Sequence, residues 1–436
     1  MRGLLLCFAW CTVLYHVIYG GFLLIMNVIN CRKILSCQQR EKVIGPTPLF
    51  VIIIPCWKEQ KIIEATINHF AKFRQMQNIL KVLLATNAHD AEDDENTTHF
   101  LARKAVQRIH AEDFIEVIVC PDDRAGKPQK LNYAIQWWRD QHPAEGVYYC
   151  IYDADSRPDI HVFHAVISLC AECKKQPDIF QQISSYCNNI SSLPSGNRAV
   201  ALADAIAQTH WALGFEYSLY EEYRFCRRKN ILRPPYYLIG HGCFISDEYY
   251  GTIGKIPEIN HCDDAALGFL SGLIKADVQM IPVLDACDVA PTSLASIKQA
   301  KSWFKGSNQF RNNLKYFMKE YGVKVPLLQQ MYWRVREYFR NFFWAWRAPL
   351  LLIAAVVGVS LHSPELLVGV LLGFLCFVLI PYVVTVSRLR SIQGIIFDPS
   401  PKEILLGSLM TVYVFVFRCI GPLLGFFDIN RRGDFS

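Results

Sequence analysis

The chain has 436 residues, of which 52% are hydrophobic and 19% are charged, with a formal net charge of +6. A disordered protein is excluded, because disorder needs low hydrophobicity and high charge. The chain is also longer than one hydrophobic core usually supports, since cores stop growing at roughly 250–300 residues. The mean hydropathy of +0.16 requires membrane segments or an unusually large core. The mild basic excess predicts no nucleic-acid partner, because such proteins concentrate positive charge on one face.

The 16 cysteines fall at irregular spacings, several of them in apolar runs, which favours free thiols over a disulfide framework. One metal-like pattern is formed by His161, His164, Cys170 and Cys173. If this stretch is a helix, the histidines and the cysteines lie on opposite faces, since each residue turns a helix by about 100°. The four side chains then cannot converge on one tetrahedral zinc.

An apolar run occupies residues 4–29 and is long enough to cross a bilayer core of ~30 Å. Gly20-Gly21 is a poor signal-peptide cleavage site, so we expect a retained transmembrane helix over residues 1–30. Basic residues follow at positions 32, 33, 40 and 42. The positive-inside rule therefore places the flank after this helix in the cytoplasm.

Residues 45–320 have the composition of an α/β domain. Runs rich in β-branched residues predict buried strands, and the stretches between them have helical spacing. The predicted strands are 50–56, 81–86, 114–120 and 147–153, and the predicted helices include 58–75, 97–110 and 129–139. This alternation predicts a doubly wound, mostly parallel sheet. Ligands of such sheets bind at the carboxyl ends of the strands.

The C-terminal third returns to membrane composition. Residues 332–347 hold eight aromatic side chains beside a stripe of arginines, which predicts an amphipathic interface helix over 328–347. Apolar runs at 348–361, 365–386 and 404–427 predict a transmembrane region of two to three helices over 348–427. The last run contains Arg418, so it either spans the bilayer or stops there and follows the interface. We expect a multi-pass protein of the cell (inner) membrane, with its catalytic domain facing the cytoplasm.

Asp153-Ala154-Asp155 closes the predicted strand 147–153. Two carboxylates at i and i+2 beyond a strand can both face a hard cation, and Mg²⁺ is typically held by one or two carboxylates plus phosphate oxygens. The same pattern also fits two surface aspartates in a turn. As a metal site, Asp153 and Asp155 would hold a divalent cation, Mg²⁺ or Mn²⁺.

Two further motifs stand at predicted helix starts. Gly126, Lys127 and Asn132 belong to a basic segment, where lysines and free N–H groups can bind phosphates; a solvated loop is the alternative. Asp263 and Asp264 precede an apolar helix. An acid there can serve as a general base on a hydroxyl or as a helix N-cap, and the two roles are compatible.

In this order, the motifs resemble those of the membrane-embedded family 2 glycosyltransferases, which have a GT-A fold. That group includes cellulose synthase, hyaluronan synthase and ceramide glucosyltransferase. The matching segments are 55–59 (P-x-x-N-E, with Lys58 for Asn), 126–132 (G-K-x-x-x-L-N), 153–155 (D-x-D), 240–242 (a glycine turn) and 263–268 (E-D-x-x-L-G). The resemblance covers residues 45–310 and extends to the flanking membrane helices.

The resemblance also implies roles for individual residues. Donor-binding residues would be Pro55, Glu59, Asn87, Lys127, Asn132 and Asp153. Acceptor-binding residues would be Gly240, His241, Gly242, Gln299 and Trp303. Asp264, beside Asp263, would be the catalytic base. Three positions depart from the pattern: Thr86-Asn87, followed by Asp90, replace an acid pair, Ser302 replaces the Arg of Q-x-x-R-W, and Asp263 replaces Glu.

The resemblance implies inverting, metal-dependent transfer of a sugar from a nucleotide sugar, a UDP-sugar, to a membrane-associated glycan or lipid acceptor. The chemistry of these residue types agrees, since a cation and lysines would neutralise the leaving diphosphate while a carboxylate takes the acceptor proton. The alternative is a catalytically inactive relative that binds a nucleotide sugar or a regulatory partner.

Overall fold

The computed structural model describes residues 2–38, 47–88, 96–143, 145–259, 262–392, 395 and 397–432. The chain forms two compact units, each assembled from segments far apart in sequence. The first, called the sheet unit, comprises Gln39–Ile183 and Tyr236–Asp285. The second, called the helical unit, comprises Met1–Gln38, Ser184–Pro235 and Ala286–Ser436. The predicted domain 45–320 draws residues from both units, and positions 40, 42 and 90 lie outside the described residues.

An eight-stranded sheet forms the centre of the sheet unit, in the order β3-β2-β1-β4-β7-β6-β8-β5. Its strands are β1 (Leu49–Pro55), β2 (Leu80–Asn87), β3 (Ile115–Cys120), β4 (Val147–Ile151), β5 (Arg157–Pro158), β6 (Ile179–Ser185), β7 (Cys243–Ser246) and β8 (Val278–Ala286). The four predicted strands are β1 to β4, and they pair in parallel as expected. The sheet changes direction at β7, which runs antiparallel to β4 and β6.

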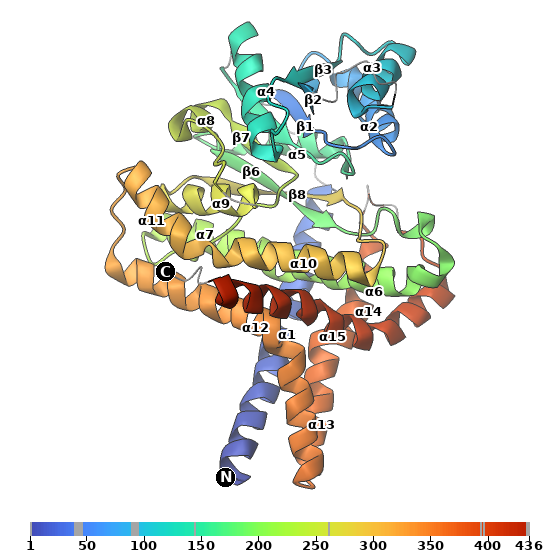
Figure 1. Cartoon of the computed structure of the whole chain (residues 1–436), viewed down its shortest axis with the longest axis vertical. Coiled ribbons are helices and arrows are strands. Elements are labelled where there is room, and N and C mark those ends of the chain that lie inside the picture. The colour runs from blue at the N-terminus through green and yellow to red at the C-terminus, as the bar shows by residue number, and fades with distance from the viewer. Residues whose placement is uncertain are drawn as a thin grey trace. The chain divides into compact units, whose positions relative to one another are not determined.

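Helices cover both faces of the parallel strands (Figure 1). The helices of this unit are α2 (Ile63–Ala71), α3 (Thr98–Arg108), α4 (Lys127–Gln141), α5 (His161–Glu172), α8 (Asp247–Ile253) and α9 (Asp263–Leu273). Side chains alternate along a strand, so Phe50, Ile52 and Ile54 face one core, which α2, α3 and α5 complete. The opposite face of β1 and β2 is covered by α4. The sheet unit therefore has a mixed α/β fold whose parallel strands all end at one edge.

Long helices make up the helical unit. They are α1 (Arg2–Gln38), α6 (Ser195–Trp211), α7 (Tyr217–Lys229), α10 (Ser293–Asn308), α11 (Phe310–Glu320), α12 (Leu327–Ser360), α13 (Pro364–Phe374), α14 (Ile380–Leu389) and α15 (Pro401–Arg432). Among the described residues, four helical segments are long and apolar enough to cross a membrane: α1, α12, the continuous rod 364–389, and α15. The chain therefore has the helices of a membrane protein, as the sequence predicted.

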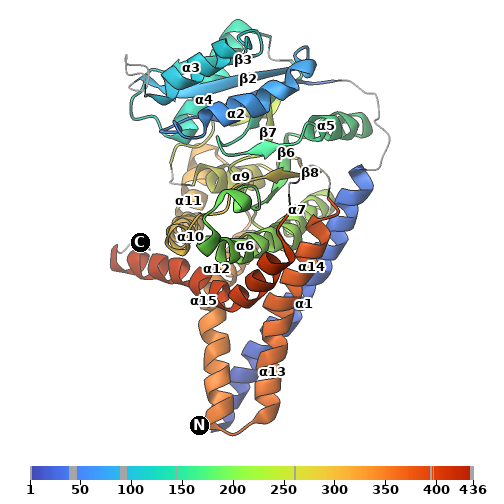
Figure 2. The same cartoon turned by 90° about the vertical axis from the view of Figure 1, so that its right-hand side faces the viewer.

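The predicted interface helix and the first C-terminal span form one continuous helix, α12, with Pro349 inside it. The rod 364–389 joins α13 to α14 through one wide helical turn, 375–379. Figures 1 and 2 show α1, the second part of α12 and α13 running together as a bundle. The same views show α15 running across this bundle, against α6 and α10.

Two features of α15 explain why it lies against these helices. Arg418 is the charge because of which the sequence did not decide whether α15 spans the bilayer. It forms an ion pair with Asp204 of α6. Gly421 and Gly425 let the backbone of α15 approach α10 closely, because a Cβ at Gly421 would lie 2.5 Å from the carbonyl oxygen of Ile297. A buried ion pair and a glycine contact thus hold the helix on its unit.

Candidate active site

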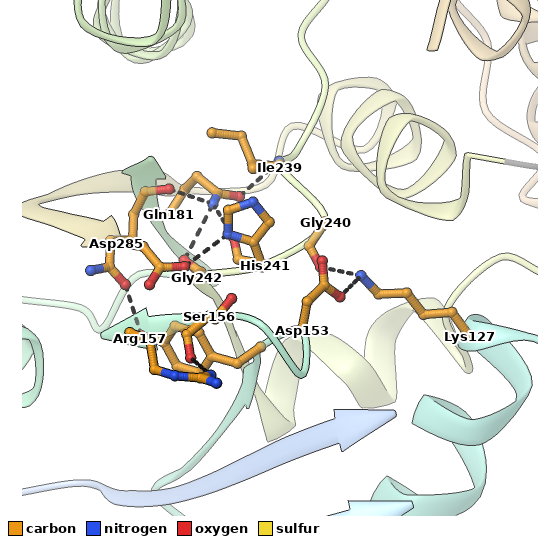
Figure 3. Close-up of polar contacts among 12 residues, drawn as sticks. Lys127, Asp153, Ser156, Arg157, Gln181, Ile239, Gly240, His241, Gly242 and Asp285 are labelled. Carbon is orange, nitrogen blue, oxygen red and sulfur yellow. Dashed lines mark hydrogen bonds and ion pairs between the residues drawn. The ribbon is translucent and has the colours of Figure 1, made fainter. Parts of the chain in front are cut away.

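Three segments of the sheet unit meet around the ammonium group of Lys127. Its Nζ atom lies 2.5 Å from Oδ1 of Asp153, with which it forms an ion pair, and 2.5 Å from the carbonyl oxygen of Gly240 (Figure 3). A Cβ built on Gly240 would lie 3.0 Å from Oδ2 of Asp264. The structure therefore brings together four residues, one from each of four motifs that are separate in the sequence.

The fold explains why these residues meet. Asp153 follows β4 by two residues, and Lys127 is the first residue of α4, which covers the neighbouring strands β1 and β2. Parallel strands end at a common edge, so groups that follow them converge there. Pro128 stands in the first turn of α4, where its missing N–H costs nothing. The segment predicted to bind phosphate is thus the start of a helix at the edge where the parallel strands end.

The two acids of the 263–268 motif occupy the first turn of α9. The N-cap position belongs to Cys262, which makes no side-chain cap, so the acids do not cap the helix in the usual way. Oδ1 of Asp264 accepts a hydrogen bond of 2.7 Å from the N–H of Ala265, which leaves Oδ2 beside Gly240. The helix start thus aims one carboxylate oxygen of Asp264 toward the Lys127 cluster.

The carboxylates of this site differ in the direction of their pKa shifts. Burial, together with the adjacent charge of Asp263, raises the pKa of Asp264 to about 6. Burial also raises the pKa of Asp263 itself. Burial opposes ionisation of Asp153 too, but the Lys127 ammonium and His241 outweigh it and lower the pKa of Asp153. Asp153 is therefore held as a carboxylate, whereas Asp264 can exchange a proton near neutral pH.

The predicted glycine turn is fixed by a buried glutamine on β6. Gln181 accepts a hydrogen bond from the N–H of Ile239 and donates to the carbonyl oxygens of His241 and Gly242 (Figure 3). Gly242 has φ +61°, a conformation that favours glycine, and a Cβ there would lie 2.7 Å from Cβ of Gln182. Sequence reasoning missed Gln181, although a glutamine pair inside the apolar strand FQQIS was a visible signal.

His241 points its Nδ1 atom at Oδ2 of Asp285, at 2.9 Å. Burial disfavours the imidazolium, but the hydrogen bond and charge of Asp285, together with Asp153, raise the pKa of His241. Asp285 was also missed, and its signal was an acid inside the fully buried strand β8. The turn that carries Gly240 therefore presents a ring whose orientation is set by a buried carboxylate.

Two predicted donor-binding asparagines are engaged in internal contacts. Asn87, at the end of β2, accepts a hydrogen bond from Lys130 and donates to backbone carbonyls of residues 122–125. Asn132 holds the loop that follows α8, through the backbone of Ile256 and the side chain of Glu258. Both asparagines shape loops at the site, and their contact with a donor stays a prediction.

The first motif lies where β1 ends. Pro55 is the last residue of β1, and Lys58 adopts the left-handed conformation with φ +60°. Burial raises the pKa of Glu59, and the charges of Asp155 and Asp153 raise it further. Glu59 therefore lies close enough to the carboxylates of the D-x-D motif to be affected by their charge. The first motif and the D-x-D motif thus lie on the same side of the sheet unit.

The remaining predicted acceptor residues belong to the helical unit. Gln299 and Trp303 both lie on α10, and both are partly buried. The neighbouring Phe304 is buried, packs edge-on against Trp344 of α12, and lies close to Gly425 of α15. The motif that contains Gln299 thus forms part of the helix layer described above, and its role toward an acceptor stays a prediction.

The residues present fit a divalent cation. Asp153 and Asp155 offer carboxylate oxygens, which are the ligands that Mg²⁺ and Mn²⁺ prefer, and neither side chain is fully buried. The lowered pKa of Asp153 keeps its carboxylate ionised and ready to ligate. Lys127 supplies a second cation at the same carboxylate.

No protein-family model matches the chain, and none of the curated proteins matches its sequence. Solved structures that match include glycosyltransferases in complex with nucleotide sugars. The mannosyltransferase PcManGT from Pyrobaculum calidifontis, in complex with GDP-Man and Mn²⁺, is 14% identical, with a TM-score of 0.46 and 98% of each chain covered. Residues 1–349 of TarS from S. aureus, in complex with UDP-GlcNAc, are 11% identical, with a TM-score of 0.39, 88% of this chain and 92% of that chain covered.

Proposed function

We propose that the protein is a membrane-bound glycosyltransferase of the family 2, GT-A type that transfers a sugar from a UDP-sugar to a lipid or glycan acceptor, with inversion. The observation that carries this proposal is the cluster of Lys127, Asp153 and Asp264 around Gly240. It joins a cationic group suited to a diphosphate with a carboxylate able to take a proton. Sugar transfer from a nucleotide sugar needs both groups in one place.

The donor side is formed by Asp153 and Asp155 together with Lys127. A divalent cation bound to these carboxylates would neutralise charge that develops on the leaving diphosphate. Lys127 adds a positive charge from the protein itself, since its ammonium can move from Asp153 to phosphate oxygens. Glu59 and Pro55 would line the nucleotide, as the resemblance implies.

The acceptor side is Asp264. Its carboxylate would take the proton of the acceptor hydroxyl while that oxygen bonds to the anomeric carbon. The bond from the anomeric carbon to the diphosphate breaks in the same displacement, and the nucleoside diphosphate leaves with its electron pair. One displacement from the face opposite the leaving group inverts the anomeric centre. A general base with a pKa near 6 suits this step at neutral pH.

The acceptor itself would reach the site from the membrane. The spanning helices and the aromatic-rich α12 support a membrane-associated substrate. Gly240, His241 and Gly242 would form the floor beneath it. The resemblance in sequence also assigns Gln299 and Trp303 to acceptor binding.

The test is nucleotide release by the purified, full-length protein with a panel of UDP- and GDP-sugars and Mn²⁺, in the presence of membrane lipids. We expect release with at least one UDP-sugar, and its loss in Asp264→Asn. Release that is equal in the two proteins would remove Asp264 as the base. The absence of release with every donor, while donor binding persists, would favour the inactive nucleotide-sugar-binding relative.

A further inference from the structure

We propose that Arg347 of α12 binds a lipid phosphate at the inner edge of the membrane. This residue belongs to the helical unit, and the inference does not depend on the proposed sugar transfer. Its guanidinium differs from those of Arg336 and Arg340 in having no carboxylate partner within the part of the chain that the structure describes.

The other partly buried arginines of the amphipathic stretch and of α15 are paired. Arg336 makes a bidentate contact with Glu222 of α7, with N–O distances of 2.5 and 2.6 Å. Arg340 pairs with Glu337 and donates to Ser307 of α10. Arg418 pairs with Asp204. The unit thus supplies an anion for each of these three cations.

Arg347 instead lies among uncharged groups. The Nε atom of Arg347 is buried and makes no hydrogen bond, and the guanidinium lies 5.7 Å from the centre of the Phe377 ring. One turn earlier on α12, Phe343 stacks on Tyr15 of α1 with ring centres 3.7 Å apart. A cation–π contact offsets only part of the cost of burying a charge, so the site is complete only with an anion.

The depth of Arg347 indicates which anion is available. Arg347 stands thirteen residues before the end of α12 at Ser360, so it lies ~20 Å along the helix from the outer turn. His16 of α1 marks the same level, because its Nε2 atom contacts the backbone oxygen of Arg347. The apolar core of a bilayer is ~30 Å thick, and interfacial helices sink ~5–10 Å into its boundary. Arg347 therefore lies where lipid phosphates are the nearest anions.

The exposed surface of α15 is consistent with placing Arg347 at the boundary of the membrane. Most of the exposed apolar side chains of α15 recur every three or four residues and so share one face of the helix: Leu405, Leu409, Val412, Val416, Ile420, Leu424 and Phe427. Arg418 and Asp428 pair with protein groups instead. This apolar face fits the acyl boundary of a membrane, and α15 then lies in the plane where Arg347 meets headgroups.

A phosphate is the anion that matches a guanidinium, because two parallel N–H groups can contact two of its oxygens. Two lipids could supply it: the diester of a bilayer headgroup, or the monoester of a lipid-linked phosphate. The two sources share the chemistry of the site and differ in affinity.

The experiment measures lipid retention by native mass spectrometry of the delipidated full chain, after addition of phosphatidylglycerol, diacylglycerol or a short polyprenyl phosphate. We expect wild type to retain phosphatidylglycerol at least about tenfold better than diacylglycerol, as one charge-assisted contact predicts. Arg347→Gln should lose this preference, Arg347→Lys should keep most of it, and Arg334→Gln, a change at an exposed arginine of the same helix, should leave it intact.

Stronger retention of polyprenyl phosphate than of phosphatidylglycerol would identify a lipid-linked phosphate, and equal retention would identify bilayer headgroups. Equal retention of phosphatidylglycerol and diacylglycerol by wild type would overturn the proposal without any variant. Unchanged phosphate preference in a folded Arg347→Gln protein would overturn it as well.

Discussion

Asp153 and Asp264 are both partly buried carboxylates, but their surroundings shift their pKa values in opposite directions. Asp153 follows a strand and faces Lys127 at 2.5 Å, and its pKa is lowered. Asp264 opens a helix beside a second aspartate, and its pKa is raised. Two identical side chains thus receive two different charge states from their surroundings, and such a difference is how one site can hold an anion and also move a proton.

The donor side should depend strongly on the charge of its carboxylates. Asp155→Ala removes one of the two proposed metal ligands, so we expect transfer to fall by ~10²–10³-fold, as for loss of one preorganised electrostatic group. Stimulation by Mn²⁺ should disappear with it. Asp140→Ala, on the exposed face of α4, serves as the control. Full Mn²⁺ stimulation in Asp155→Ala would place the metal elsewhere.

The close packing of Gly240 between Lys127 and Asp264 can be tested by adding a Cβ at this position. A Cβ there would lie 3.0 Å from Oδ2 of Asp264 and 3.1 Å from Nζ of Lys127, so one of these groups must shift in Gly240→Ala. Since small misplacements of reacting groups cost up to ~10²-fold, we expect a loss of about tenfold or more in kcat. Gly251→Ala, in α8, meets only an atom of Arg139 at 3.8 Å and should keep its activity. Equal activity of the two variants would separate Gly240 from the site.

The two charge states should appear in the pH profile. Asp264 must be ionised to accept a proton, so kcat should fall about tenfold for each pH unit below a pKa of about 6. The pKa of Asp153 is lowered, so its carboxylate stays ionised in this range and the donor KM should change little. A kcat that stays level between pH 7 and pH 5 would rule out the raised pKa of the base.

The smallest effect is expected at Lys58, on the donor side. Its φ of +60° is costly for a lysine and common for an asparagine, the residue that the motif usually has. Lys58→Asn should therefore stabilise the protein by up to ~1 kcal/mol. Thermal unfolding of the purified protein measures this change. A lower melting temperature would mean that the Lys58 side chain, which lies over the Trp57 ring, stabilises the turn.

The sequence predicted the place of Asp153 in the fold better than the contacts of the glycine turn. Strand periodicity located the end of β4, and with it the D-x-D motif. The partners of these residues could not be predicted, because they come from distant segments: Gln181 lies 58 residues before Ile239, and Asp285 lies 44 residues after His241. A single sequence carries no signal for such pairings beyond a polar residue inside an apolar strand.

The membrane segments show the same limit. Composition located all four long helices, because apolar length is a local property. The course of α15 could not be read in this way, since it depends on the pairing of Arg418 with Asp204, 214 residues earlier. The reversal of the sheet at β7 is a further long-range pairing that local periodicity does not specify.

One measurement tests the division between the two carboxylates most directly: donor affinity and transfer rate determined on the same preparation of Asp264→Asn. The account predicts that the UDP-sugar Kd stays close to that of wild type while transfer falls by ~10²–10⁴-fold, the usual contribution of a general base. Near-full transfer by this variant, or a loss of donor binding equal to the loss of transfer, would contradict it.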